Sequence, residues 1–295
     1  MTEGDDFART GTGVKLGKQY SLRPAGRNGF EMKRIFRKVF PLRKETGRPS
    51  PLPPQIEDIR QKALKGHSLE IVQWGQILLD SIYVRKDPAG ALEWFTIAAN
   101  AGFGPGHNMR GRCFQFGWGC EKDLMKAAQC YEAAARAGDE WGRYNLGILT
   151  MRGIGQPQDL PKALDLFRTA ALNGHAKSMN LYARFLEEGW VVPQDRAAAL
   201  SWYQKSAENG DYRGQHNLAT ALVDAGQIEA ALDWWHKAVV EATSDILLAM
   251  DRTLSRLGPK ADSALLAKVR SRLDQLGITA PAGAGAGISD ENNRQ

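Results

Sequence analysis

The sequence contains little cysteine. Its 295 residues include three cysteines, Cys113, Cys120 and Cys130, and all lie in one stretch. A disulfide-stabilised extracellular domain has an even set of cysteines spread along the chain, so this pattern favours a reducing cytoplasm. His107 is close in sequence, but the spacing matches no zinc signature, and we expect no bound metal ion.

Long hydrophobic runs are also missing. No stretch reaches the roughly 20 apolar residues that a membrane-spanning helix needs. The start of the chain, with Glu3, Asp5 and Asp6, is acidic and no apolar segment follows it, so we expect no signal peptide. Hydrophobic residues make up 43% of the chain, which is enough to build a folded core.

The excess of basic charge is confined to the N-terminal part of the chain. Residues 1–50 hold 12 of the 39 basic residues and 5 of the 33 acidic ones, a balance of +7. The rest of the chain carries 27 basic and 28 acidic residues and is close to neutral. A solenoid that wraps nucleic acid needs a basic stripe to displace counterions, so we expect no nucleic-acid partner.

Catalytic motifs are absent from the sequence. It contains no Ser-x-x-Lys, Gly-x-Ser-x-Gly or His-Glu-x-x-His arrangement. The five histidines show no ligand spacing, and the Gly-x-Gly at 11–13 and the Gly-Ala run at 283–287 follow no strand, so neither is a phosphate loop. We therefore expect no enzyme activity and no cofactor.

Small and aromatic residues recur every 36 residues along most of the chain. A fixed period of this length indicates an architecture of stacked repeats. The columns are Gly66, Gly102, Gly138, Gly174 and Gly210; Ala63, Ala99, Ala135, Ala171 and Ala207; Ala91, Ala127, Ala163 and Ala199; Phe95, Tyr131, Phe167 and Tyr203; Asp87, Asp123, Asp159 and Asp195; and Gly75, Gly111, Gly147, Ala183 and Ala219.

Each column suggests a structural role. Ala163, Phe167 and Ala171 have the spacing of one helix face. Asp159 precedes this helix and can accept hydrogen bonds from its free backbone N–H groups. Gly174 follows the last turn, where a left-handed residue ends a helix without steric cost. Gly147 and its equivalents lack bulk, which lets the second helix of each hairpin pack closely against the first.

The period divides the chain into helical hairpins and tails. We expect a lone second helix at 54–65, hairpins at 67–102, 103–138, 139–174, 175–210 and 211–242, and capping helices at 244–258 and 261–276. Ala225-Gly226 marks a shortened loop in the fifth hairpin. Residues 1–53 and 278–295 are predicted to be mostly disordered tails. The predicted fold class is an all-α solenoid, with the repeats at 54–242 and the caps at 243–277.

The third hairpin carries a family resemblance. Its sequences DEWGRYNLG at 139–147 and GIGQPQD at 153–159, followed by Lys162-Ala163 and Ala170-Ala171, resemble the Sel-one-like repeat family, a relative of the tetratricopeptide repeat. The resemblance covers 67–242, and 54–65 as a half unit, and it departs at 81–86 and in the fifth loop. It implies a right-handed superhelix that binds proteins as a scaffold or adaptor. Some secreted members carry cysteine columns, and one such group is linked to penicillin binding; those columns are absent here.

The resemblance also implies where a partner would bind. In such solenoids the first helix of each hairpin lines the concave face, and side chains not used for packing can contact a peptide or protein. Asn donates and accepts hydrogen bonds, Arg pairs with carboxylates, and Trp and Tyr supply contact area. The predicted groove residues are Gln73, Gln76, Asn108, Arg112, Gln115, Trp141, Tyr144, Asn145, Arg152, Asn180, Arg184, His216, Asn217 and Thr220. The alternative is that they form solvated helix faces, with Trp141 and Tyr144 packed between hairpins.

A second candidate surface is a basic amphipathic segment at 30–43. Its apolar residues fall on one helical face and its basic residues elsewhere, a pattern that suits an anionic membrane or an acidic partner groove. The segment is about three turns long, so any membrane contact would be weak. The predicted contact residues are Lys33, Arg34, Phe36, Arg37, Lys38 and Phe40.

The expected function is therefore a cytoplasmic, non-catalytic scaffold or adaptor that binds a protein or peptide through its concave face. Two alternatives remain open at this stage: a membrane-peripheral adaptor tethered by 30–43, and a regulatory subunit of an enzyme complex. The sequence identifies no individual partner.

Overall fold

The computed structural model describes residues 51–80 and 82–278, and the chain divides into two compact units between Leu166 and Phe167. The described residues form α helices and one short 3-10 helix, and contain no strand. This confirms the predicted all-α fold class. The predicted tail helix at 30–43 and most of both predicted tails lie outside the described residues.

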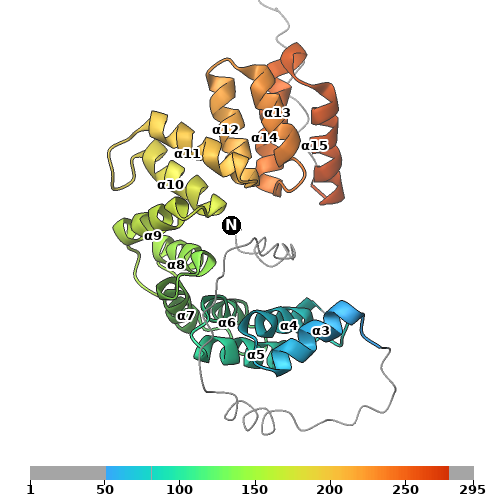
Figure 1. Cartoon of the computed structure of the whole chain (residues 1–295). Coiled ribbons are helices and arrows are strands. Elements are labelled where there is room, and N and C mark those ends of the chain that lie inside the picture. Colours follow the sequence, from blue (N-terminus) through green and yellow to red (C-terminus); the bar gives the residue numbers. More distant parts are fainter. Residues whose placement is uncertain (1–50, 81, 279–295) are drawn as a thin grey trace, which may run out of the picture. The chain divides into compact units, whose positions relative to one another are not determined.

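The first unit contains successive antiparallel helices (Figure 1). A lone helix precedes two full hairpins, and the first helix of the next hairpin follows them. We call the first helix of each hairpin helix A and the second helix B. The helices are α3 (Pro54–Leu64), α4 (Ser68–Asp80), α5 (Pro88–Asn100), α6 (Gly104–Phe116), α7 (Leu124–Arg136) and α8 (Glu140–Arg152); α9 (Leu160–Leu172) spans the division between the units.

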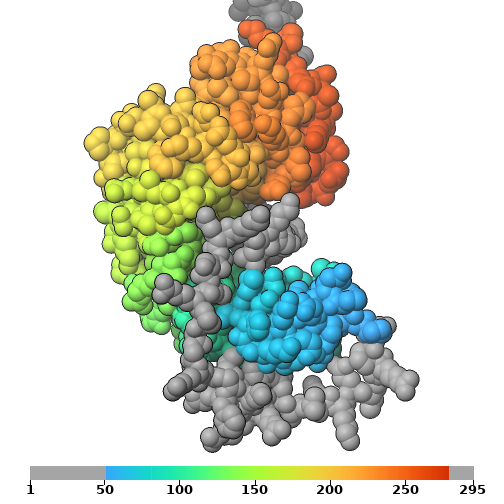
Figure 2. Space-filling view, viewed as in Figure 1, coloured from blue at the N-terminus to red at the C-terminus, as the bar shows by residue number. Residues whose placement is uncertain are grey.

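The second unit continues the hairpins and ends in the capping helices. The predicted caps at 244–258 and 261–276 correspond to its last two α helices. Figure 2 shows the atoms of the C-terminal helices, in orange and red, packed against one another without a visible gap. The helices are α10 (Ala176–Glu188), α11 (Arg196–Glu208), α12 (Tyr212–Asp224), α13 (Ile228–Ala238), α14 (Ser244–Leu257), the 3-10 helix η1 (Gly258–Lys260) and α15 (Ser263–Gln275).

Aspartate caps start the B helices as predicted. The side chains of Asp87, Asp123, Asp159 and Asp195 each accept a hydrogen bond of 2.9 Å from the backbone N–H three residues later. These bonds satisfy donors that have no partner inside the helix. The acidic column therefore fixes where each B helix begins.

Glycine ends the B helices as predicted. Gly66, Gly102, Gly138, Gly174 and Gly210 all have positive φ, between 77° and 91°. In this conformation the chain leaves the helix and turns into the next helix A, and a side chain would be strained there. The glycine column therefore marks the end of each B helix.

The small-residue column on helix A makes room for the aromatic column on helix B. A Cβ atom on Gly75 would lie 2.5 Å from Phe95, and one on Gly111 would lie 2.7 Å from Tyr131. Both aromatic side chains are fully buried. The prediction that these glycines permit close packing within a hairpin is confirmed at both positions.

A second small-residue column, which the sequence analysis did not identify, brings α6, α8 and α12 onto the preceding helix B. Cβ atoms on Gly106 and Gly142 would lie 2.6 Å and 2.3 Å from Ala98 and Ala134. Gly142 and Gly214 also donate their backbone N–H groups to caps at Asp139 and Asp211. The signal was available, because Gly106, Gly142 and Gly214 fall on the same 36-residue grid.

The last hairpin and the capping helices share one apolar core. Three residues link α12 to α13 in the last hairpin, whereas seven residues link α10 to α11 in the hairpin before it. This confirms the predicted shorter loop. Trp235, Leu247, Met250 and Leu265 are fully buried in this core. The capping helices thus cover apolar surface that a further hairpin would otherwise bury.

Candidate partner-binding surface

The A helices lie side by side within each unit. In the first unit α6 contacts both α4 and α8, and in the second unit α10 contacts α12. We call the outward side of these helices the A-helix surface, defined by the predicted groove residues that they carry. Each unit presents its own part of this surface.

Asparagine pairs join neighbouring A helices. Asn145 on α8 donates from Nδ2 to Oδ1 of Asn108 on α6 at 2.9 Å, and Asn217 on α12 donates to Asn180 on α10 at 2.8 Å. Asn108 and Asn180 are 8% and 3% exposed. The predicted asparagines are thus brought together, and their first role is to hold adjacent A helices in register.

Two arginines of the surface lie over tryptophan rings. The Cζ atom of Arg112 is 5.1 Å from the centroid of the Trp118 ring, and that of Arg184 is 5.2 Å from the centroid of Trp190. Both tryptophans are half-buried. The loop tryptophans therefore fold back over helix A.

Tyrosines of the B helices form hydrogen bonds to helix A near both of these arginine–tryptophan contacts. The hydroxyl of Tyr131 donates to Oε1 of Gln115, and that of Tyr203 donates to Oε2 of Glu187 at 2.6 Å. Burial raises the pKa of both phenols, so each remains a donor. Gln115 is therefore held in place from inside the hairpin.

Trp141 and Tyr144 on α8 contact each other but differ in exposure. Their rings meet edge to face with centroids 6.2 Å apart. Tyr144 is buried, whereas Trp141 is 45% exposed, and Arg152 at the end of the same helix is also exposed. The burial of Tyr144 fits the alternative in which this side chain is used for packing, whereas Trp141 offers apolar area at the surface.

The remaining predicted residues make local contacts. Gln76 donates to Asp80 at 2.8 Å, Thr220 donates to the backbone oxygen of His216, and Gln73 is half-buried. Trp235 donates from Nε1 to Nδ1 of His216 at 3.2 Å. Burial lowers the pKa of His216 to about 4, so this ring is neutral near pH 7.

Among the described residues the thiols form no reactive or metal-binding site. Burial raises the pKa of Cys113 to about 12, and it also raises the pKa of Cys120 and of Cys130. A thiol is a nucleophile or metal ligand only as the thiolate. Across residues 51–80 and 82–278, no group of three metal-ligating side chains comes together.

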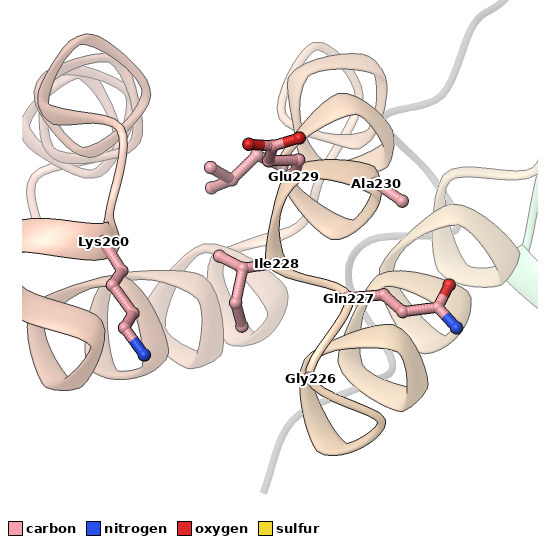
Figure 3. Close-up of a pocket in the computed structure, with 7 residues that line it drawn as sticks. Gly226, Gln227, Ile228, Glu229, Ala230 and Lys260 are labelled. Carbon is pink, nitrogen blue, oxygen red and sulfur yellow. The ribbon is translucent and has the colours of Figure 1, made fainter.

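One pocket of about 580 Å³ lies in the second unit, between the α12–α13 turn and η1. Gln227, Glu229 and Lys260 line it, and their side chains point in different directions (Figure 3). A small-molecule site needs polar groups that converge on the ligand. This pocket lacks such convergence and contributes no candidate site.

The repeats of this chain match the model of a known protein family. The Sel1 repeat model matches residues 72–103, 105–139, 142–175 and 176–211. These four segments correspond to the hairpins whose caps and small-residue columns are described above. The chain is a Sel1 repeat protein. Sel1 repeat proteins are generally non-catalytic scaffolds that bind other proteins.

Solved structures share the fold of this Sel1 repeat protein. A Sel1 repeat protein from Oxalobacter formigenes is similar with a TM-score of 0.65 at 23% identity, over 75% of this chain and 99% of that one. An immunity protein from Pseudomonas aeruginosa is similar with a TM-score of 0.50 at 16% identity, over 77% of this chain and 84% of that one. No curated protein matches the sequence.

The helices of this Sel1 repeat protein are short. In the part of the chain that the structure describes, none combines the length and apolar character needed to cross a membrane.

Proposed function

We propose that this Sel1 repeat protein is a non-catalytic scaffold that binds a protein partner along the A-helix surface. The observation that carries the proposal is the asparagine pairing of adjacent A helices. It holds α6 beside α8, and α10 beside α12, so that side chains of successive helices form one continuous face in each unit.

The composition of this face supports protein binding rather than catalysis. It combines an exposed tryptophan, Trp141, with arginines, and both residue types are enriched where binding energy concentrates in protein interfaces. Its amides can donate and accept hydrogen bonds. His216 is neutral and hydrogen-bonded to a core tryptophan, and the thiols are protonated, so the described residues offer no activated nucleophile or base there.

The test is partner capture with surface variants of the full chain. Trp141→Ala combined with Arg152→Ala changes two exposed side chains of the A-helix surface. Met125→Ala changes a side chain of α7 that is 64% exposed, and it serves as the control. We expect wild type and Met125→Ala to retain the same protein, and the double variant to lose it.

Binding must then be repeated with the purified partner, and all three proteins must show the same melting temperature. A double variant that binds the purified partner as tightly as Met125→Ala would contradict the proposal.

A further inference from the structure

Arg112 and Arg184 are equivalent residues in different chemical surroundings. They lie 72 residues apart, and each guanidinium lies over the tryptophan six residues later. A guanidinium that rests on a ring face keeps donors at its edge, which suits planar recognition of a carboxylate. The two places therefore share one binding geometry.

Charge distinguishes the two places. Below Arg112, Tyr131 is paired with the neutral Gln115, and the next residue is Phe116. In the second unit, Tyr203 is paired with Glu187, and the next residue is Glu188. Both glutamates are near enough to raise the pKa of Tyr203. Arg184 thus lies among carboxylates, whereas the equivalent side chains near Arg112 are uncharged.

Arg112 has no counterion among the residues that the structure describes. Within the described residues no carboxylate oxygen lies within 4.0 Å of its nitrogens, and its one close polar contact is to the sulfur of Met109 at 3.9 Å. The charge of Asp80, at the end of α4, raises the pKa of Arg112 from a longer distance. Asp80 also already accepts a hydrogen bond from Gln76. Burial lowers the pKa of Arg112, which shows that its charge is partly removed from water.

An uncompensated, partly buried cation gains more from an external carboxylate than an exposed one does. Gln115 adds to this preference. Its Oε1 is occupied by Tyr131, so its amide N–H groups remain to donate to a ligand. Glu187 has no N–H group and would repel the same ligand.

We propose that Arg112 and Gln115 form a binding site for a carboxylate side chain of an acidic peptide segment, and that the equivalent place at Arg184 does not bind it. The inference rests on the proposed function, because the peptide segment would belong to the partner protein. It adds the chemistry that selects this partner: a negative charge presented to α6 rather than to α10.

The test uses a blocked heptapeptide in which alanine and glutamate alternate, with the matching glutamine peptide as control. The indole N–H signals of Trp118 and Trp190 in ¹⁵N NMR spectra of the full chain report each place separately, after assignment with Trp118→Phe and Trp190→Phe. We expect the glutamate peptide to shift the Trp118 signal saturably while the Trp190 signal stays in place. The glutamine peptide should leave both unchanged.

Variants then separate charge from folding. Gln115→Glu keeps an acceptor for Tyr131, because Glu187 already fulfils this role for Tyr203. It should weaken the response of Trp118 by roughly 10- to 100-fold in affinity, as should Arg112→Gln, since a hydrogen bond to a charged group is lost. Arg184→Gln should leave the response unchanged. The reverse exchange, Glu187→Gln combined with Glu188→Phe, should make the glutamate peptide shift the Trp190 signal.

Binding that is unaffected by Gln115→Glu, or a Trp118 signal that does not move, overturns this inference. Neither result bears on the scaffold proposal, which is judged by the Trp141→Ala, Arg152→Ala variant and a purified partner. Conversely, the Trp118 signal could respond to the glutamate peptide while the Trp141→Ala, Arg152→Ala variant still binds the purified partner. That outcome would support the carboxylate site and contradict the proposal of partner binding along the A-helix surface.

Discussion

Asn145 on α8 donates a hydrogen bond to Asn108 on α6, and this pair joins two A helices that are separated in sequence by a whole helix B. Asn108 is buried, so its Oδ1 has little access to water as a substitute partner. Asn145→Ala should therefore lower the free energy of unfolding by about 1–2 kcal/mol, because a buried acceptor is left without its donor. Urea denaturation of the full chain measures this change.

Two further variants show whether the loss comes from the pair. Asn100→Ala, at an exposed position ending α5, should change stability by less than about 0.5 kcal/mol. Once Asn108→Ala is present, adding Asn145→Ala should cost less than it does alone. Fully additive losses would mean that the two side chains act independently and that the hydrogen bond is not what joins the helices.

The contact of Gly75 with Phe95 gives a second prediction. Gly75→Ala would place a methyl group 2.5 Å from the Phe95 ring, and the fully buried ring cannot move freely. We expect the free energy of unfolding to fall by about 1–3 kcal/mol despite the better helix propensity of alanine. Thermal and urea unfolding measure the change.

The matching compensation is Phe95→Leu, which makes space beside position 75. Phe95→Leu alone should destabilise the chain by leaving a cavity, and the double variant should be more stable than the sum of the two losses predicts. Strict additivity would show that the close contact does not limit packing here.

The sequence could predict the repeat but not the pairing of its surface residues. The aspartate, glycine and aromatic columns recur at one interval, so each local role could be inferred and then counted along the chain. Asn108 and Asn145 are 37 residues apart and Asn180 and Asn217 likewise, one residue off the period. Their contact depends on how two A helices are rotated against each other, and the 36-residue grid cannot show this rotation.

Arg112 shows a different limit of the sequence. Its place on helix A could be predicted, but its contact with the ring of Trp118, which lies in the loop after helix A, could not. The 72-residue interval that relates the Arg112–Trp118 pair to Arg184–Trp190 was present in the sequence. The sequence could not show that the side chains near Arg112 are uncharged, because this depends on which carboxylates approach the guanidinium in the folded chain.

His216 gives a prediction about pH. Burial lowers the pKa of its ring from 6.5 to about 4 in the folded chain, so between these values the unfolded chain binds more protons than the folded chain does. His216 therefore makes the fold less stable as the pH falls from 6.5 towards 4, with a slope of up to about 1.4 kcal/mol per pH unit. Urea unfolding at a series of pH values measures this slope.

His216→Gln should reduce the slope in that window, because glutamine does not titrate and its carbonyl can still accept from Trp235. His67→Gln provides a control at an exposed histidine and should leave the slope as it is in wild type. An unchanged slope in His216→Gln would show that this ring is protonated as readily in the folded chain as in the unfolded chain.

Val191 gives the last prediction. It has φ of +56°, whereas glycine occupies the equivalent places, Gly119 and Gly155, with φ of +73° and +69°. A β-branched residue in this left-handed region costs about 1–2 kcal/mol, and its side chain is half exposed, so it gains little from burial in return. Val191→Gly should raise the free energy of unfolding by about 1 kcal/mol, after allowing for the greater backbone entropy of glycine in the unfolded chain. Val192→Gly, next to it and at an ordinary φ, should instead lower stability, and urea denaturation of the two variants decides between strain and a general tolerance of this loop to glycine.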